Sequence, residues 1–289
     1  MQSISQTARY CLRLLRSVIP YRERTSWIIS HSASTQVLII AVIDGSTSKT
    51  TRRHSSRMSN GRYAMTLVAD YIRHMPATST CHEFCVGVTK KIYQHYLTPV
   101  FHAWHREKRL QQLLQHPEER MTASAVVFSR LRREIWLVGD CHCLIDGAYF
   151  DNPKPYEDEL AEIRARRAKQ LLANGMTIDE MLRDDPARQA MIPRMLETMK
   201  EQNSTYAVID GFTIPEHKVP IITLGFQSHE LVLASDGYPF LRPTLTESEQ
   251  LLMKQKSEDP MNIGTFKATK GFFPDNHSFD DRTYIRFQV

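Results

Sequence analysis

The chain has 289 residues, of which 42% are hydrophobic and 24% are charged, and this composition excludes a disordered or fibrous protein. Its longest apolar run, Val37 to Ile43, is far shorter than the roughly 18 residues of a membrane-spanning helix, so no membrane span is expected. Five cysteines are too few for a disulfide framework, so we expect reduced thiols and a cytoplasmic location.

The net charge of +5 is concentrated near the start of the chain, where residues 1–62 contain ten Lys or Arg against two acidic residues. No aromatic-interleaved basic motif accompanies this charge, so we interpret it as a solvated face and expect no nucleic-acid partner. Residues 1–24 form a basic segment, interpreted either as a loosely ordered leader or as a short targeting helix. Residues 25–289 are predicted to form one domain.

The first half of the chain predicts one strand, two helices and a hairpin. Val37–Ile43 has the uninterrupted apolar run of a buried strand. Apolar residues at helical spacing then predict a helix from 61 to 75 and a long helix over 84–114 that is kinked at Pro99. Two β-branched and aromatic runs, 123–131 and 134–138, have the pattern of a β-hairpin.

The second half predicts a helical block and then strands. Helices are expected over 155–174 and after a capping box formed by Thr177 and Glu180. A later helix is expected to be capped by Thr246 and Glu249. The remaining apolar runs predict strands over 206–209, 219–224, 230–234 and 283–288. This order favours mixed sheets covered by helices over a doubly wound parallel sheet.

Aspartates stand at the ends of several predicted strands. Asp44 and Asp236 each end an apolar run and are followed by glycine. Asp140 ends another run, and Asp280 precedes the final strand. If folding brings these carboxylates together, their repulsion requires cations, and oxygen-only ligands favour Mg²⁺ or Mn²⁺ over Zn²⁺. Two such ions about 4 Å apart activate a water for attack on phosphorus.

The same aspartates have a simpler interpretation. Asp-Gly is a common turn dipeptide, and the string VIDG occurs both at 42–45 and at 208–211, with IDG also at 145–147. Taken alone, each of these is the sequence of an ordinary turn. The combination of strand ends in which the aspartates stand is what favours a shared site.

Four ordered segments resemble the metal-dependent serine/threonine protein phosphatases of type 2C. They are AVIDGSTS, TASAVVFSRLRREIWLVGDC, HELVLASDGYPFL and SFDDRTYIRF, and the resemblance covers most of the chain from residue 37 onward. It implies an α/β sandwich: two packed antiparallel β-sheets flanked by helices, in α-β-β-α layers. It also implies two Mg²⁺ or Mn²⁺ ions and a weak third, held by Asp44, the carbonyl of Gly45, Asp236, Asp280 and, for the third ion, Asp140.

The resemblance implies hydrolysis of phosphoserine and phosphothreonine in a phosphoprotein substrate through a metal-bridged water. Two departures from the family stand against full activity. Ser46 occupies the place of a histidine that assists the leaving group, and such assistance is worth about 10² to 10⁴ in rate. Arg24 and Thr25 replace an expected Glu-Asp pair. For the phosphate-binding arginine we name Arg22 and Arg24 as candidates, although a surface arginine is the more ordinary interpretation of each.

Two other functions stay open from the sequence. A catalytically weak or inactive relative would keep the sandwich and bind a partner, and a phosphatase of a small phosphorylated metabolite would differ only in its loops. A zinc site is set aside, because the spacings of Cys81 with Cys85 and of Cys141 with Cys143 match no recognised pair of zinc ligands.

Overall fold

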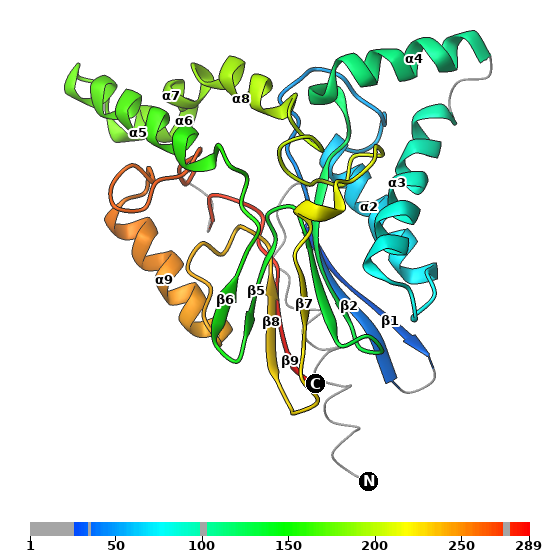
Figure 1. The fold of residues 1–289 in the computed structure, drawn as a ribbon. Coiled ribbons are helices and arrows are strands. Elements are labelled where there is room, and N and C mark those ends of the chain that lie inside the picture. Colours follow the sequence, from blue (N-terminus) through cyan, green and yellow to red (C-terminus); the bar gives the residue numbers. More distant parts are fainter. Residues whose placement is uncertain (1–25, 34–35, 99–102, 274–277) are drawn as a thin grey trace.

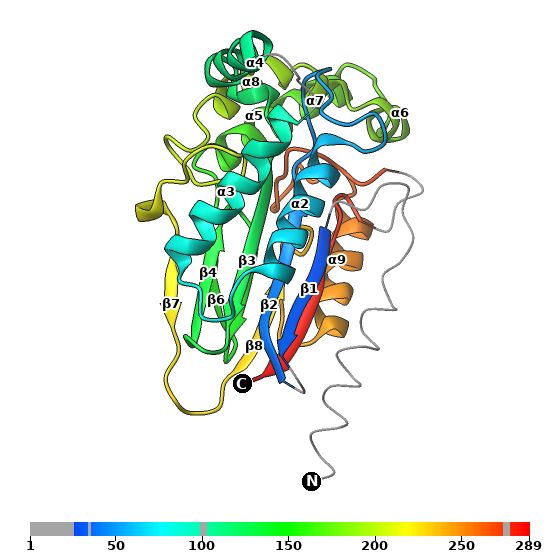
Figure 2. The ribbon, with the colours of Figure 1, turned by 90° about the vertical axis from the view of Figure 1, so that its right-hand side faces the viewer.

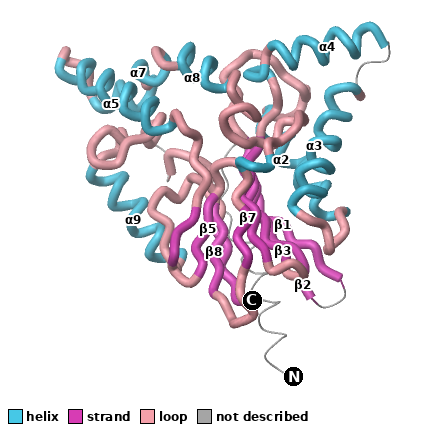
Figure 3. The backbone as a smooth tube through the Cα atoms, in the orientation of Figure 1, coloured by secondary structure: helices cyan, strands magenta, loops and turns pink. Residues whose placement is uncertain are grey.

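The computed structural model describes residues 26–33, 36–98, 103–273 and 278–289 (Figure 1). Two antiparallel β-sheets pack face to face, and helices cover their outer faces, as the resemblance implied (Figures 1 and 3). Within the described residues, the first sheet has the order β1 (Ser26–Ala33), β2 (Gln36–Gly45), β3 (Ala123–Ser129), β4 (Glu134–Val138) and β7 (Ile221–Thr223). The second has the order β6 (Ala148–Phe150), β5 (His142–Ile145), β8 (Glu230–Ala234) and β9 (Tyr284–Gln288).

The helices form three groups. The first sheet is covered by α2 (Asn60–His74) and α3 (Cys81–Leu97), which is followed by α4 (Ala103–Gln115). The second sheet is covered by α9 (Leu245–Glu258). One end of the sandwich carries α5 (Glu157–Ala173), α6 (Ile178–Asp184), α7 (Pro186–Gln189) and α8 (Ile192–Met199), as Figure 2 also shows. No helix in the described part of the chain has the length and apolarity needed to cross a membrane.

The uninterrupted apolar run of β2 is explained by burial on both faces. Ile39, Ala41 and Ile43 pack in the core under α2 and α3. The alternate residues, Ile40 and Val42, pack in the core between the two sheets. Because successive side chains of a strand point to opposite faces, a strand covered on both sides has no polar positions.

In the first sheet, strand pairing brings Asp44 and Asp140 to the same end. Asp44 pairs with Ser124 near the start of β3. The next strand, β4, is antiparallel to β3, so its last residue, Val138, lies beside that start. Asp140 follows soon after, and the Ser124 hydroxyl donates a hydrogen bond to its Oδ1 atom at 2.5 Å.

Strand pairing in the second sheet places Asp236 and Asp280 at the same end of the sandwich as Asp44 and Asp140. The last residue of β8, Ala234, pairs with Tyr284, the first residue of β9. Asp236 follows the end of β8, and Asp280 precedes the start of β9, so antiparallel pairing places them together. Helices α5 to α8 lie over the same end of the sandwich (Figure 1).

Several sequence predictions need correction. The long helix predicted over 84–114 is two helices, α3 and α4, and in α4 the large apolar side chains Trp104 and Leu114 are 71% and 59% exposed. Residues 206–209 form no strand, because Tyr206 and Ile209 pair only through isolated bridges, with Gln202 and Ala123 respectively. The sequence also contains two overlapping capping boxes, and α9 uses the earlier one, Thr244 with Glu247, so that Leu245 packs against the second sheet.

The second VIDG string, at 208–211, stabilises the fold and contributes no carboxylate to the aspartate end. Asp210 is fully buried, and its Oδ2 atom accepts a hydrogen bond from Arg120 at 2.9 Å. Asn203 donates to the other oxygen at 2.7 Å. Burial, only partly offset by Arg120, raises the pKa of Asp210. Residues 210–212 form a bend in which Gly211 has a positive φ, so this string has a structural role.

Arg120→Met should destabilise the protein by about 3 to 5 kcal/mol, because it leaves the buried Asp210 carboxylate without its cation. Chemical denaturation of the variant and of Arg130→Met, which removes an exposed arginine, measures the difference. Equal unfolding midpoints for the two variants would contradict the structural importance of this ion pair.

Candidate metal centre

The four predicted aspartates line one pocket. It has a volume of about 140 Å³. The predicted residues in its lining are Asp44, Gly45, Asp140, Asp236 and Asp280. Side chains separated by up to 236 positions in the sequence therefore meet in one place.

Two glycines beside these aspartates permit close approach of backbone segments. A Cβ atom on Gly45 would overlap the carbonyl group of Gly61, where α2 begins. A Cβ atom on Gly237 would overlap the carbonyl oxygen of Asp281. Both Asp-Gly dipeptides thus have a packing explanation, and Gly237 holds the segment before β9 against the end of β8.

Asp44 and Asp236 carry unsatisfied oxygens. The Oδ1 atom of each is buried and has no hydrogen-bond partner in the described part of the protein. Burial, followed by repulsion from Asp280 and Asp140, raises the pKa of Asp44 well above its ordinary value. The pKa of Asp236 is raised by the same causes. A buried carboxylate oxygen without a partner is costly, so these two atoms are suited to a cation.

Asp140 and Asp280, by contrast, have both oxygens engaged. Asp140 accepts from the Ser124 hydroxyl on Oδ1 and forms an ion pair with Lys154 on Oδ2. Asp280 accepts from the next backbone N–H on Oδ1, at 2.9 Å, and pairs with Lys270 on Oδ2. Burial opposes ionisation of Asp140, but Lys154 and Ser124 outweigh it and hold the pKa of Asp140 below its usual range.

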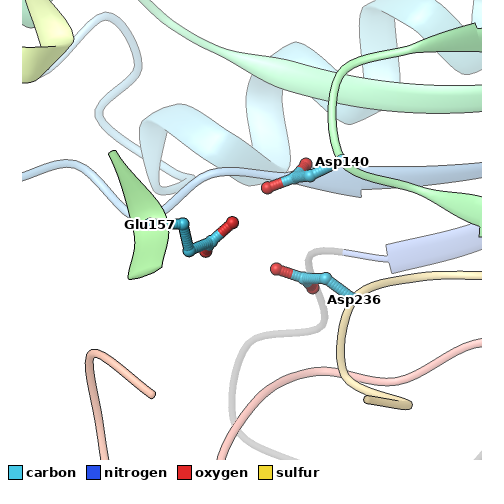
Figure 4. Close-up of side chains that lie close together, drawn as sticks. All are labelled: Asp140, Glu157 and Asp236. Carbon is cyan, nitrogen blue, oxygen red and sulfur yellow. The ribbon is translucent and has the colours of Figure 1, made fainter. Parts of the chain in front are cut away.

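Glu157 adds a fifth carboxylate that the sequence did not indicate. It lies in the first turn of α5, and its ligand atom is within 4.8 Å of those of Asp140 and Asp236. Figure 4 shows the three carboxylates pointing toward one another. Burial raises the pKa of Glu157. Acidic residues are ordinary at the start of a helix, so only its position in the fold distinguishes Glu157.

Four basic side chains also line the pocket, and none was singled out from the sequence: Lys49, Lys154, Arg188 and Lys270. Lys49 comes from the loop after β2 and Arg188 from α7. Both donate to backbone carbonyls, and neither forms an ion pair with a carboxylate within the described ranges. Burial, followed by repulsion from Arg188, Lys270 and Lys154, lowers the pKa of Lys49 to about 7.

Arg22 and Arg24 fall outside the described residues, as does the whole segment 1–24. Cys81 and Cys85 are buried in the core under α3. Cys141 and Cys143 are buried in the core between the sheets, where thiols act as small apolar side chains.

Neither a family model nor a curated protein matches the chain. Among solved structures, it is similar to the serine/threonine phosphatase Stp1 from Staphylococcus aureus, with 14% identity and a TM-score of 0.41 over 93% of this chain and 90% of that chain. It is also similar to the catalytic domain of the serine/threonine protein phosphatase PstP in complex with two manganese ions, with 10% identity and a TM-score of 0.38 over 82% and 80% of the two chains.

A third structure, a bacterial serine phosphatase, aligns with 14% identity and a TM-score of 0.40 over 94% of this chain and 92% of that chain. All three are named as serine or serine/threonine phosphatases.

Proposed function

We propose that this protein is a metal-dependent phosphatase that hydrolyses phosphoserine and phosphothreonine in proteins. The observation that carries the proposal is the pair of buried, unpartnered oxygens of Asp44 and Asp236 in a pocket that also contains cationic side chains. Hard oxygen ligands of this kind suit Mg²⁺ or Mn²⁺. A bound divalent ion supplies Lewis-acid activation of water and of the phosphoryl group.

We assign the acidic side chains of the pocket to the metal ion and two of the basic side chains to the phosphoryl group. Asp44 and Asp236 would hold the ion, with the carbonyl of Gly45 beside them. Lys49 and Arg188 line the same pocket and form no ion pair with a carboxylate of the described residues, so they are available to the oxygens of a phosphoryl group. We propose them for phosphoryl binding beside Arg22 and Arg24, the candidates named from the sequence.

The size of the pocket favours a protein substrate over a free metabolite. At about 140 Å³, the pocket is smaller than the roughly 300 to 1,000 Å³ of sites that enclose whole small molecules. It accommodates a phosphoryl group while the rest of the substrate stays outside, as a phosphorylated side chain requires. The described cysteines are free and buried, which agrees with the cytoplasmic location that we propose.

Hydrolysis of p-nitrophenyl phosphate tests the proposal. The full-length chain should release nitrophenolate when Mn²⁺ is added, and EDTA should stop the reaction. No hydrolysis with Mn²⁺ or Mg²⁺ at any concentration would contradict the proposal and favour the alternative of an inactive phosphatase-like binding protein.

Lys49→Met and Arg188→Met should each raise KM for p-nitrophenyl phosphate by about 10- to 100-fold, because a hydrogen bond to a charged group is worth about 1.5 to 3 kcal/mol. The matched control is Arg183→Met, which removes an exposed arginine on the neighbouring helix α6. An unchanged KM in both pocket variants would exclude them from phosphoryl binding.

Anion binding should also depend on pH through Lys49. Because its pKa is lowered to about 7, the ammonium is present below that pH and is lost as the pH rises through it. Affinity for sulfate, which stays a dianion throughout, should therefore fall between about pH 6 and 8. Calorimetric titration of the wild type and of Lys49→Arg, which keeps its charge, checks this. The fall should be smaller in the arginine variant, where only carboxyl groups with a raised pKa, those of Asp44, Asp236 and Glu157, still lose protons.

A further inference from the structure

The four predicted aspartates of the pocket differ in whether their carboxylate oxygens have bonding partners. Asp44 and Asp236 have a buried oxygen without a partner, whereas Asp140 and Asp280 are fully engaged inside the protein. In both engaged cases one partner is a lysine ammonium, Lys154 or Lys270. Two of the four predicted metal ligands are therefore already neutralised by the chain itself.

Lys154 contacts a group of three carboxylates whose spacing suits a metal ion. Asp140, Glu157 and Asp236 have ligand atoms within 4.8 Å of one another (Figure 4). Lys154 pairs directly with Asp140, and Glu157 and Asp236 also attract its ammonium group. Lys154 thus supplies positive charge where an additional divalent ion would otherwise supply it.

The charges of the whole pocket also disfavour the binding of additional divalent ions. Five carboxylates and four basic side chains line it. A tethered ammonium has a high effective concentration at its partner, so an ion from solution must displace it. Displacement also leaves a partly buried ammonium without a partner, which is costly. The Oδ1 atoms of Asp44 and Asp236 accept no bond from either lysine or from any other group in the described part of the chain, so an ion there displaces no direct partner.

We propose that Lys154 and Lys270 are built-in cations, and that the pocket therefore takes a single divalent ion, at Asp44 and Asp236, in place of the two or three that the sequence resemblance implies. This inference rests on the proposed function for the presence of a divalent ion. It concerns the number of ions, which is measured without reference to turnover.

The test is a count of bound Mn²⁺ per full-length chain by equilibrium dialysis, with free Mn²⁺ measured by electron paramagnetic resonance. The wild type should bind one ion. The double variant Lys154→Met/Lys270→Met should bind at least one more, and Lys90→Met, which removes an exposed lysine on α3, should stay at one. The variant Lys154→Arg/Lys270→Arg keeps both charges and should also stay at one.

A second readout covers the possibility that the methionine variant folds poorly. In EDTA its melting temperature should fall below that of the wild type, and Mn²⁺ should restore it, because an ion then replaces the lost ammonium groups. Two or more ions of similar affinity in the wild type, or one ion in the folded methionine variant, would overturn the inference. One bound ion without hydrolysis would remove the proposed function and leave the inference standing. Hydrolysis with two bound ions would support the proposed function and overturn the inference.

Discussion

Asp44→Asn should lower Mn²⁺-dependent hydrolysis of p-nitrophenyl phosphate by at least about 10²-fold, since even outer-shell partners of a bound metal are worth about 10- to 100-fold. Asp44 contributes one of the two buried, unpartnered carboxylate oxygens of the pocket. An amide keeps the shape of the side chain but removes the charge that attracts a divalent ion.

The same substitution should leave the metal-free protein at least as stable as the wild type. Asp44 is repelled by Asp280, Asp140 and Asp281, so a neutral side chain relieves this repulsion. Thermal unfolding in EDTA therefore separates a loss of chemistry from a loss of fold. Activity within a few-fold of wild type, in a variant of unchanged stability, would show that Asp44 holds no ion needed for hydrolysis.

Gly237→Ala should have the second largest effect, because the added methyl group overlaps the Asp281 carbonyl oxygen. Overpacking of this kind costs about 1 to 3 kcal/mol and is relieved only by moving backbone. The backbone at Gly237 would then move away from the segment before β9, and the adjacent Asp236, which we propose as a metal ligand, would move with it. We expect a lower unfolding midpoint together with weaker Mn²⁺ binding, both measured on the same preparation.

The matched control for this substitution is Gly225→Ala. Its added methyl group meets only the side chain of Gln227, which is exposed and free to move. If both glycine variants keep wild-type stability and Mn²⁺ affinity, close backbone approach at Gly237 is not what positions the carboxylates.

The layers of the fold could be predicted where each strand is covered on both faces. The apolar run of β2 and the pattern of β8 gave both strands almost to their observed ends. The strands β5 and β6 were not predicted, because four and three residues are too few to show a strand pattern. The turn between them, where Asp146 and Gly147 have positive φ, agrees with the turn interpretation of IDG.

The candidate site was predictable only in part, for a physical reason. An aspartate at the end of an apolar run is visible in the sequence, because a carboxylate there needs a polar environment that a strand end provides. Glu157 and Lys154 lie in a charged stretch that looks like a solvated surface, and only the fold brings α5 over the end of the sandwich. The same holds for Arg188 on α7.

Release of inorganic phosphate from a phosphoserine peptide tests the central claim most directly. With Mn²⁺ present, the full-length wild-type chain should release phosphate, while the wild type in EDTA and Asp236→Asn with Mn²⁺ should release none above background. Equal release by the wild type and Asp236→Asn, or none by the wild type under any divalent ion, would contradict the claim that these converging aspartates form a phosphatase centre.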